Sequence, residues 1–397
     1  MKIVVLVGDG MGDFPVESLG GLTPLQAAKT PTLQKIASSG DLRMVNTVPK
    51  NLSPGSDVAN MALLGYDAEH NYTGRAPIEA AGADIEMEAS DVAFRCNLVT
   101  IKNNIMKDYS AGHISSEESL EIIQFLQNQL SDEDTNFYNG VQYRHILMTN
   151  GMGEKTVCVP PHEIIDKNIL KFLPAGVDSD RIINLMNKSH ELLKNHPVNL
   201  NRIKQGKNPA THIWLWGQGR QMKLESYENL YGLSGGIISA VDLLKGLARL
   251  TGLKAPDVEG ATGFIDTNYK GKVEAALEIL NEEDFVFVHI EAPDECGHLG
   301  DAHLKTKAIE LFDSEICQPI LNWLESQNNQ YLLILCMDHR TPVSLKGHTS
   351  DPVPMVALHG PISKYNCNVS FDENVNNGIS QCNAYEWIQQ LLLNVTK

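Results

Sequence analysis

The sequence predicts an α/β protein with a doubly wound, mostly parallel sheet and a smaller inserted α+β domain. Nearly continuous aliphatic runs occupy residues 2–7, 285–290 and 331–337. Such runs are typical of strands that are buried on both faces of a parallel sheet. Helical patterns alternate with these strands, as in βαβ units. The middle of the chain, by contrast, mixes short strands with amphipathic helices.

The N-terminal part contains the first strand and two helices. The strand at residues 2–7 ends in the glycine-rich loop GDGMGD. A Thr-Pro pair opens a helix that continues to residue 37, because proline suits the first helical turn. A turn at residues 53–56 precedes a second helix at residues 57–64, which Gly65 ends.

The middle of the chain is predicted to be a separate α+β domain at residues 91–208. Its polar stretch KQGKNP, at residues 204–209, has the composition of a hinge. The core domain is therefore predicted at residues 1–90 and 209–397. The expected elements of the insertion are strands at residues 93–100 and 143–148 and helices at residues 116–129 and 182–196.

Aliphatic strands return after the predicted hinge. The run HIWLW at residues 212–216 is expected to rejoin the core domain, and a short strand at residues 236–239 precedes a helix at residues 240–250. In doubly wound sheets, ligands bind beyond the carboxyl ends of the strands. The loops that follow these strands are therefore where catalytic residues are expected.

Composition narrows the class of protein. The 397-residue chain has 42% hydrophobic and 20% charged residues, as expected of a folded globular protein. A formal net charge of -17 argues against nucleic acid or an anionic membrane as partner, although metal ions could let a small anionic substrate bind. The seven cysteines are odd in number and lack CxxC spacing, which favours a reducing compartment. With no bilayer-length apolar stretch, a cytoplasmic enzyme is expected.

Metal-type ligands follow three of the aliphatic strands. One such strand end means little, but three are unusual, and two of them add a histidine within four residues. Carboxylate and imidazole ligands without thiolates are typical of Mn²⁺, Mg²⁺ and transition-metal sites. Two such ions can stabilise both ends of an in-line phosphoryl transfer. The candidate ligands are Asp9, Asp294, His298, Asp338, His339 and His348.

Ser56 begins the helix that follows the turn SPGSD. One interpretation is that Ser56 or Ser53 only caps this helix, since serine is a favoured N-cap residue. The other is that Ser56 is a nucleophile, because a helix N-terminus favours anions and a neighbouring metal ion lowers the pKa of a hydroxyl. The six nearby ligands favour the nucleophile.

Several cations are candidate contacts for an anionic substrate, since arginine binds phosphate and carboxylate in a bidentate manner. Solvated surface charge is an equally good interpretation of each one alone. These candidates, with one histidine, are Arg75, Arg95, His113, Arg220 and Lys245.

Several segments of the chain resemble one family. They include VLVGDGMGD, SPGSDVANMALLGYD, GGIISAVDLLKGLARLTG, HIEAPDECGH and MDHRTPVSLKGHTSDPVP. In this order they are similar to the archaeal-type cofactor-independent phosphoglycerate mutases, which belong to the alkaline phosphatase superfamily. The resemblance runs nearly end to end. It implies an alkaline-phosphatase-like core and an isomerase of glycolysis that interconverts 3-phosphoglycerate and 2-phosphoglycerate through a phosphoserine.

The resemblance also implies roles for individual residues. Two divalent ions are expected, with Mn²⁺ first and Mg²⁺, Co²⁺ or Zn²⁺ as alternatives. The implied first metal site is Asp9, Ser56, Asp338 and His339, with Ser56 as the phosphorylated residue. The implied second site is Asp294, His298 and His348. The implied substrate-side groups are Asp108 and His113 in the inserted domain, with Arg220 and Lys245 in the core.

Other functions would use the same metal and serine groups. Transfer to another alcohol, such as homoserine, is one alternative, and plain phosphate hydrolysis is another. A sulfatase is disfavoured because neither C-x-P-x-R nor S-x-P-x-R occurs. A metal-stabilised binding module would leave Ser56 without a role. The expected partner is a small phosphorylated molecule, and the expected state is a monomer or small homo-oligomer. An inserted domain that closes over the site would exclude water.

Overall fold

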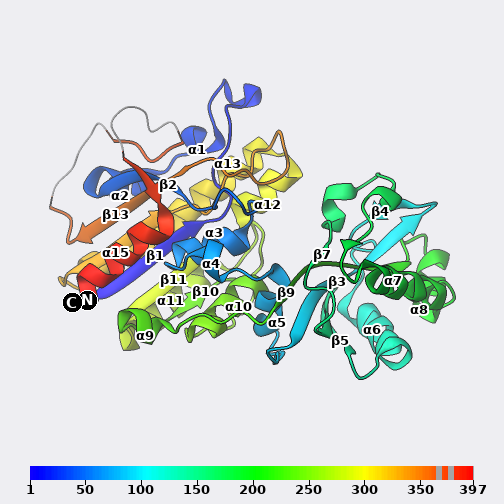
Figure 1. The fold of residues 1–397 in the computed structure, drawn as a ribbon. Helices are drawn as coiled ribbons and strands as arrows, with labels where there is room; N and C mark the ends of the chain where they lie inside the picture. Colours follow the sequence, from blue (N-terminus) through cyan, green and yellow to red (C-terminus); the bar gives the residue numbers. More distant parts are fainter. Residues whose placement is uncertain (364–368, 374–379, 397) are drawn as a thin grey trace. The chain divides into compact units, whose positions relative to one another are not determined.

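The structure is a computed structural model that describes residues 1–363, 369–373 and 380–396. It consists of two compact units (Figure 1). Unit 1 combines Met1–Tyr72 with Leu224–Lys397, and unit 2 is Thr73–Lys223. The insertion of one unit into the other follows the order expected from the sequence.

A seven-stranded sheet forms the centre of unit 1. Strand β13 runs antiparallel to both of its neighbours, and the other pairings are parallel. The predicted doubly wound, mostly parallel sheet is therefore confirmed. In sheet order the strands are β10 (Gly235–Ile238), β11 (Phe285–Ile290), β1 (Lys2–Gly8), β12 (Tyr331–Cys336), β13 (Val353–Gly360), β2 (Asp41–Asn46) and β14 (Gln381–Asn383).

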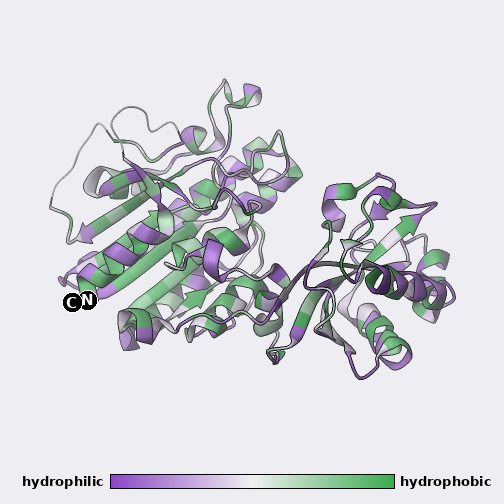
Figure 2. Cartoon of the chain, in the orientation of Figure 1, coloured by the Kyte–Doolittle hydropathy of each residue, from purple (hydrophilic) through white to green (hydrophobic). Residues whose placement is uncertain are grey.

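Helices cover this sheet. Strands β11 and β12 are buried along their whole length, and Figure 2 shows the central strands as mostly hydrophobic. One group of helices in mutual contact is α2 (Pro31–Ser39), α11 (Tyr269–Glu282), the π-helix η4 (Phe312–Cys317) and α14 (Gln318–Ser326). Another is α3 (Ser56–Leu63), α9 (Tyr227–Tyr231), α10 (Asp242–Thr251) and α15 (Ala384–Thr396). The remaining helices are η1 (Glu17–Leu19), α1 (Pro24–Ala27), α4 (Ala68–Asn71), α12 (Ala292–Leu299) and α13 (Ala302–Leu311).

Unit 2 is built on an antiparallel sheet in the order β4-β3-β6-β5, with β9 also paired to β3. One hydrophobic core joins the sheet to its long helices. The strands are β3 (Asp91–Lys102), β4 (Ile105–Asp108), β5 (Thr135–Val141), β6 (Arg144–Asn150), β7 (Thr156–Val157), β8 (Ala175–Gly176) and β9 (His212–Arg220). The helices are α5 (Arg75–Gly82), α6 (Ser116–Leu130), η2 (Pro161–Ile164), η3 (Ile169–Lys171), α7 (Ser179–Leu193) and α8 (Pro197–Lys204).

The bounds of this unit differ from the predicted insertion at residues 91–208. Strand β9 was expected in the core sheet, but it pairs antiparallel with β3, from Val92–Arg220 to Val99–His212. Helix α5 packs against β3 and β9, so it also belongs to unit 2. The predicted hinge at residues 204–209 is instead held within unit 2, where the Arg202 guanidinium donates to the Asn208 carbonyl at 2.8 Å.

Two expectations from composition can be compared with the described residues. No described helix is both long and apolar enough to cross a membrane. The six described cysteines are free thiols, and Cys367 lies outside the described residues.

A buried ion pair holds the GDGMGD loop. The Lys305 ammonium, which is fully buried, lies 2.9 Å from the Asp13 carboxylate and donates to the carbonyl oxygens of Gly12 and Thr341 at 2.8 Å each. Asp13 also accepts the backbone N–H of Val343 at 3.2 Å. This network ties the loop after β1 to the loop after β12.

We expect Lys305→Met to destabilise unit 1 strongly. It would leave the Asp13 carboxylate buried without its cation, at a cost of about 3–5 kcal/mol. Urea titration measures this change in the free energy of unfolding. Lys307→Met is the matched control, because the Lys307 side chain is 57% exposed and its pair with Glu310 is a surface pair, worth about 1 kcal/mol or less. Equal effects of the two substitutions would contradict the role given to Lys305.

Candidate metal centre

The predicted metal ligands come from three neighbouring strand ends. Asp9 follows β1, which pairs in parallel with both β11 and β12. Helix α12 begins directly after β11, and Asp338 directly follows Met337 at the end of β12. Because adjacent parallel strands end at the same edge of a sheet, their terminal side chains converge there.

Asp9, Asp338 and His339 form one group. The three side chains offer ligand atoms within 4.8 Å of one another. His339 Nε2 lies 3.5 Å from Asp9 Oδ1 and 3.4 Å from Asp338 Oδ2. All three residues are at most 1% exposed.

Asp294, His298 and His348 form a second group. Asp294 and His298 lie four residues apart in α12 and so share one helix face, with His298 Nε2 at 3.2 Å from Asp294 Oδ2. His348 Nε2 lies 3.4 Å from Asp294 Oδ1 and 3.0 Å from His298 Nε2. His339 is also within 4.8 Å of Asp294 and His348, so it is shared by both groups.

Ser56 is the first residue of α3 and faces the first group. Its hydroxyl lies 3.1 Å from His339 Nε2 and 3.5 Å from Asp9 Oδ2. The helix is capped at Gly55 without any side-chain hydrogen bond, so neither serine serves as its cap. Asn60, one turn along the helix, donates to the Ser56 carbonyl and to Asp338 Oδ2. The hydroxyl is therefore held at the cluster and at the positive end of the helix dipole.

Burial and charge shift the pKa values in this cluster in opposite directions. Burial, with the like charges of Asp338 and Asp294, raises the pKa of Asp9 well above its usual value. Burial lowers the pKa of His339 to about 4, so this imidazole is neutral. Burial also opposes the charging of His298, but its hydrogen bond to Asp294 outweighs that and raises the pKa of His298 to about 9.

These residues fit divalent cations. Buried like charges at this separation repel strongly unless cations offset them. Asp9 Oδ1 is buried and accepts no hydrogen bond from the described residues. Carboxylate oxygen and imidazole nitrogen, without thiolate, are the donors that Mn²⁺ and similar ions accept.

Sequence reasoning missed several supporting residues. His289 is fully buried on β11, with Nε2 at 3.1 Å from Asp9 Oδ2 and Nδ1 at 3.4 Å from the Ser239 hydroxyl. Thr341 donates to Asp294 and lies 3.2 Å from His339 Nδ1. No local pattern in the sequence marks either His289 or Thr341.

The contacts of the predicted substrate-side residues lie within the unit to which each residue belongs. Asp108 is engaged by its own loop, accepting from Ser110 and Gly112 at 2.8 Å. His113 is exposed. Arg220, predicted in the core, belongs to unit 2, where it pairs with Glu154 at 2.8 Å. Lys245, on α10 of unit 1, pairs with Asp257.

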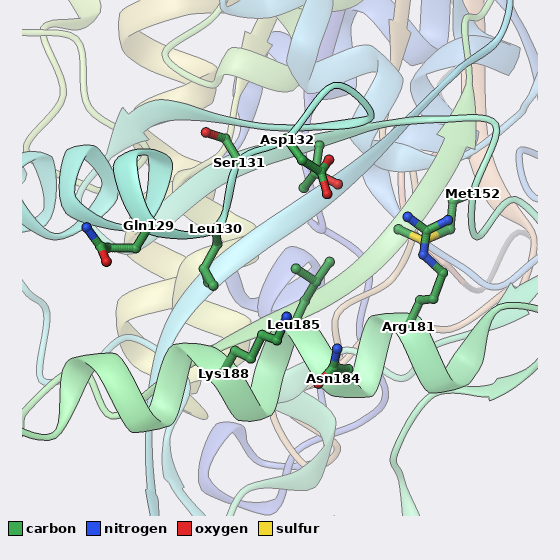
Figure 3. Close-up of a pocket in the computed structure, with 10 residues that line it drawn as sticks. Gln129, Leu130, Ser131, Asp132, Met152, Arg181, Asn184, Leu185 and Lys188 are labelled. Atoms are coloured by element: carbon green, nitrogen blue, oxygen red, sulfur yellow. The ribbon is translucent and has the colours of Figure 1, made fainter.

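A cavity of about 350 Å³ in unit 2 lies between the end of α6 and helix α7. Figure 3 shows Arg181, Leu185 and Lys188 on α7 facing the segment that carries Ser131 and Asp132. None of the residues predicted from the sequence lines this cavity.

Metal binding should release protons. His298 has a pKa of about 9 without metal, so it is protonated at pH 7.5 and must lose its proton to coordinate an ion. We expect at least about one proton to be released per chain. The affinity for the metal ion should rise as the pH approaches 9. Titration calorimetry with Mn²⁺, in buffers of different ionisation enthalpy at pH 7.5, measures this number. His298→Asn should reduce it, and release of no proton would contradict the assignment.

Comparison with known proteins identifies the family. Residues 37–199 match the family described as 2,3-bisphosphoglycerate-independent phosphoglycerate mutase. A protein of that name from Methanosarcina mazei is 49% identical over 380 residues, covering 95% of this chain and 96% of its own. A probable enzyme of that name from Geobacter sulfurreducens is 47% identical, with 94% of each chain covered.

Solved structures agree over the full length. A protein from Pyrococcus horikoshii matches with a TM-score of 0.81 and 27% identity, covering 100% of this chain and 98% of its own. A cofactor-independent phosphoglycerate mutase from Thermoplasma acidophilum matches with a TM-score of 0.64 and 25% identity, covering both chains completely. The chain therefore belongs to the family of 2,3-bisphosphoglycerate-independent phosphoglycerate mutases.

Proposed function

We propose that this chain interconverts 3-phosphoglycerate and 2-phosphoglycerate through a phosphoserine formed on Ser56. The observation that carries the chemistry is the Ser56 hydroxyl, 3.1 Å from His339 Nε2 and beside the buried carboxylate cluster. The choice of substrate follows from relatives of that name, one of which is 49% identical over 95% of this chain.

Two divalent ions, Mn²⁺ first among them, are part of this proposal. They would be held by Asp9, Ser56, Asp338 and His339 on one side and by Asp294, His298 and His348 on the other. Such ions supply positive charge that stabilises a deprotonated serine and the phosphoryl oxygens. The donor types and the orphaned Asp9 oxygen support this assignment.

Ser56 and Asn60 have different tasks in the reaction. Ser56 Oγ attacks phosphorus in line, so that a serine–phosphorus bond forms as the bond to the substrate oxygen breaks. The other hydroxyl of the retained glycerate then attacks phosphorus, which restores free Ser56. Asn60 supports both steps, because it links the Ser56 backbone to Asp338 and keeps the start of α3 against the cluster. The N-terminus of α3 also favours the phosphoryl anion.

Further assignments belong to the same proposal. A cytoplasmic location is supported by the free thiols among the described residues, which suit a reducing compartment. A place in glycolysis follows from the interconversion proposed above. Substrate contacts by Asp108, His113, Arg220 and Lys245 stay predictions, as does a monomer or small homo-oligomer.

An enolase-coupled assay tests the activity. Purified protein with Mn²⁺ and 3-phosphoglycerate should generate 2-phosphoglycerate. Release of inorganic phosphate instead would identify a phosphatase. Phosphorylation of homoserine, with no mutase signal, would identify a kinase of another alcohol. No signal with any divalent metal ion would overturn the proposal.

We expect Ser56→Ala to reduce turnover by about a thousandfold or more, because the covalent route is lost. The matched control is Ser53→Ala, an exposed serine three residues earlier in the same turn. Mass spectrometry of acid-quenched protein should find the phosphoryl group on Ser56 in the parent and in the control. Normal turnover by the Ser56 variant would exclude the phosphoserine.

A further inference from the structure

The Thr341 hydroxyl lies between the two groups of candidate metal ligands. It donates a hydrogen bond to Asp294 Oδ1, and Asp294 belongs to the second group. The same oxygen lies 3.2 Å from Nδ1 of His339, the residue that both groups share. Thr341 is 0% exposed, so bulk water does not compete for either contact. One buried hydroxyl therefore contacts ligands of both groups.

Backbone contacts fix the position of Thr341. Its N–H donates to the Gly12 carbonyl at 3.1 Å, and its own carbonyl accepts from the buried Lys305 ammonium at 2.8 Å. The residue before it, Arg340, forms β-bridges with Met11 and Gly12. The backbone of Thr341 is thus held on both sides, which restrains the position of its hydroxyl.

Two glycines leave room for this side chain. A Cβ atom on Gly10 would lie 2.6 Å from Thr341 Oγ1 and 2.5 Å from Asp294 Oδ1. A Cβ atom on Gly297, in α12, would lie 2.8 Å from the Thr341 methyl group. Gly10 also has a φ of 59°, which glycine adopts most readily. The GDGMGD loop can therefore approach the hydrogen-bonded pair of Thr341 and Asp294 only because it carries glycine there.

The single proton of the hydroxyl sets the direction of both hydrogen bonds. A carboxylate that binds a metal ion is ionised and can only accept, so the Thr341 proton is directed to Asp294. The Thr341 oxygen then accepts from His339, so Nδ1 carries the one proton of the neutral imidazole. The lone pair of His339 is consequently on Nε2, the atom that lies 3.5 Å from Asp9 Oδ1 and 3.4 Å from Asp338 Oδ2. Coordination of an ion beside these carboxylates requires this tautomer.

We propose that Thr341 is a positioning residue that serves both metal sites. Its hydroxyl holds His339 in the Nδ1-protonated tautomer and orients the Asp294 carboxylate, so that both residues present ligand atoms for an ion. The inference rests on the metal centre proposed above, but it does not depend on which substrate is used. Residues that hydrogen-bond to metal ligands typically contribute about ten- to a hundredfold to metal affinity.

Metal affinity measured without substrate tests this role. The metal-free, full-length protein is titrated with Mn²⁺ by calorimetry. Thr341→Val keeps the shape of the side chain and removes the hydroxyl, so it should weaken both Mn²⁺-binding events by about tenfold or more. Thr341→Ser keeps the hydroxyl and should bind Mn²⁺ nearly as tightly as the parent. If the valine variant does not fold, Thr341→Ala is compared with Thr341→Ser, since these two also differ by the hydroxyl.

Thr251→Val is the matched control. Thr251 is also 0% exposed, and its hydroxyl donates to the Leu247 carbonyl at 2.7 Å within α10, a helix that carries none of the candidate ligands. Removal of this hydroxyl should lower the melting temperature of the metal-free protein and leave the affinity for Mn²⁺ unchanged. An equal loss of affinity in Thr251→Val and Thr341→Val would overturn the proposal, because the effect would then be general destabilisation.

The other outcomes separate this inference from the proposed metal centre. Weaker binding in both events by Thr341→Val, with affinity retained in Thr341→Ser, supports the positioning role. Unchanged affinity in Thr341→Val, or a loss confined to one of the two events, overturns it and leaves the metal centre in place. Equal losses in the serine and valine variants also overturn it, because they would assign the effect to packing of the methyl group. A parent protein that binds no divalent ion overturns both proposals.

Discussion

The burial of three carboxylates at one edge of the sheet is the constraint on which the rest of unit 1 depends. Asp9, Asp294 and Asp338 are at most 5% exposed, and their repulsion raises the pKa of Asp9. In a low-dielectric interior this arrangement needs cations to offset it. The parallel pairing of β1 with β11 and β12 creates the convergence, because neighbouring parallel strands end at the same edge. The neighbouring histidines and the serine hydroxyl complete the set of donors.

Hydrogen bonds between the surrounding segments hold these carboxylates in position. The buried Lys305 binds both Asp13 and the Thr341 carbonyl, so it connects the loop after β1 to the loop after β12. Asn60 connects α3 to the same edge through Asp338. The Ser56 hydroxyl and the candidate metal ligands thus belong to separate elements that share hydrogen-bond partners. This arrangement restrains the distance between the Ser56 oxygen and the candidate ligands, as the proposed in-line transfer requires.

The strongest sequence patterns predicted the sheet and the Asp and His residues that converge at its carboxyl edge. Aliphatic runs that end in Asp or His place their residues at the carboxyl edge whatever the details of the loops. The domain bounds were wrong because β9 has the composition of a core strand, and only its pairing with β3 assigns it to unit 2. Thr341 and Lys305 were missed because their roles depend on contacts between distant segments, which no local pattern encodes.

His339 lies within reach of both ligand groups, and its ring packs 4.1 Å from that of His348. The two proposed coordination sites therefore share a candidate donor and are not separate modules. An ion that draws His339 towards Asp9 changes the donor set available to its neighbour, so the two sites should fill interdependently. A substitution at His339 that changes the ion preference of one site would also change the ion preference of the other. Selectivity would have to be adjusted through residues that only one group contacts, such as His298.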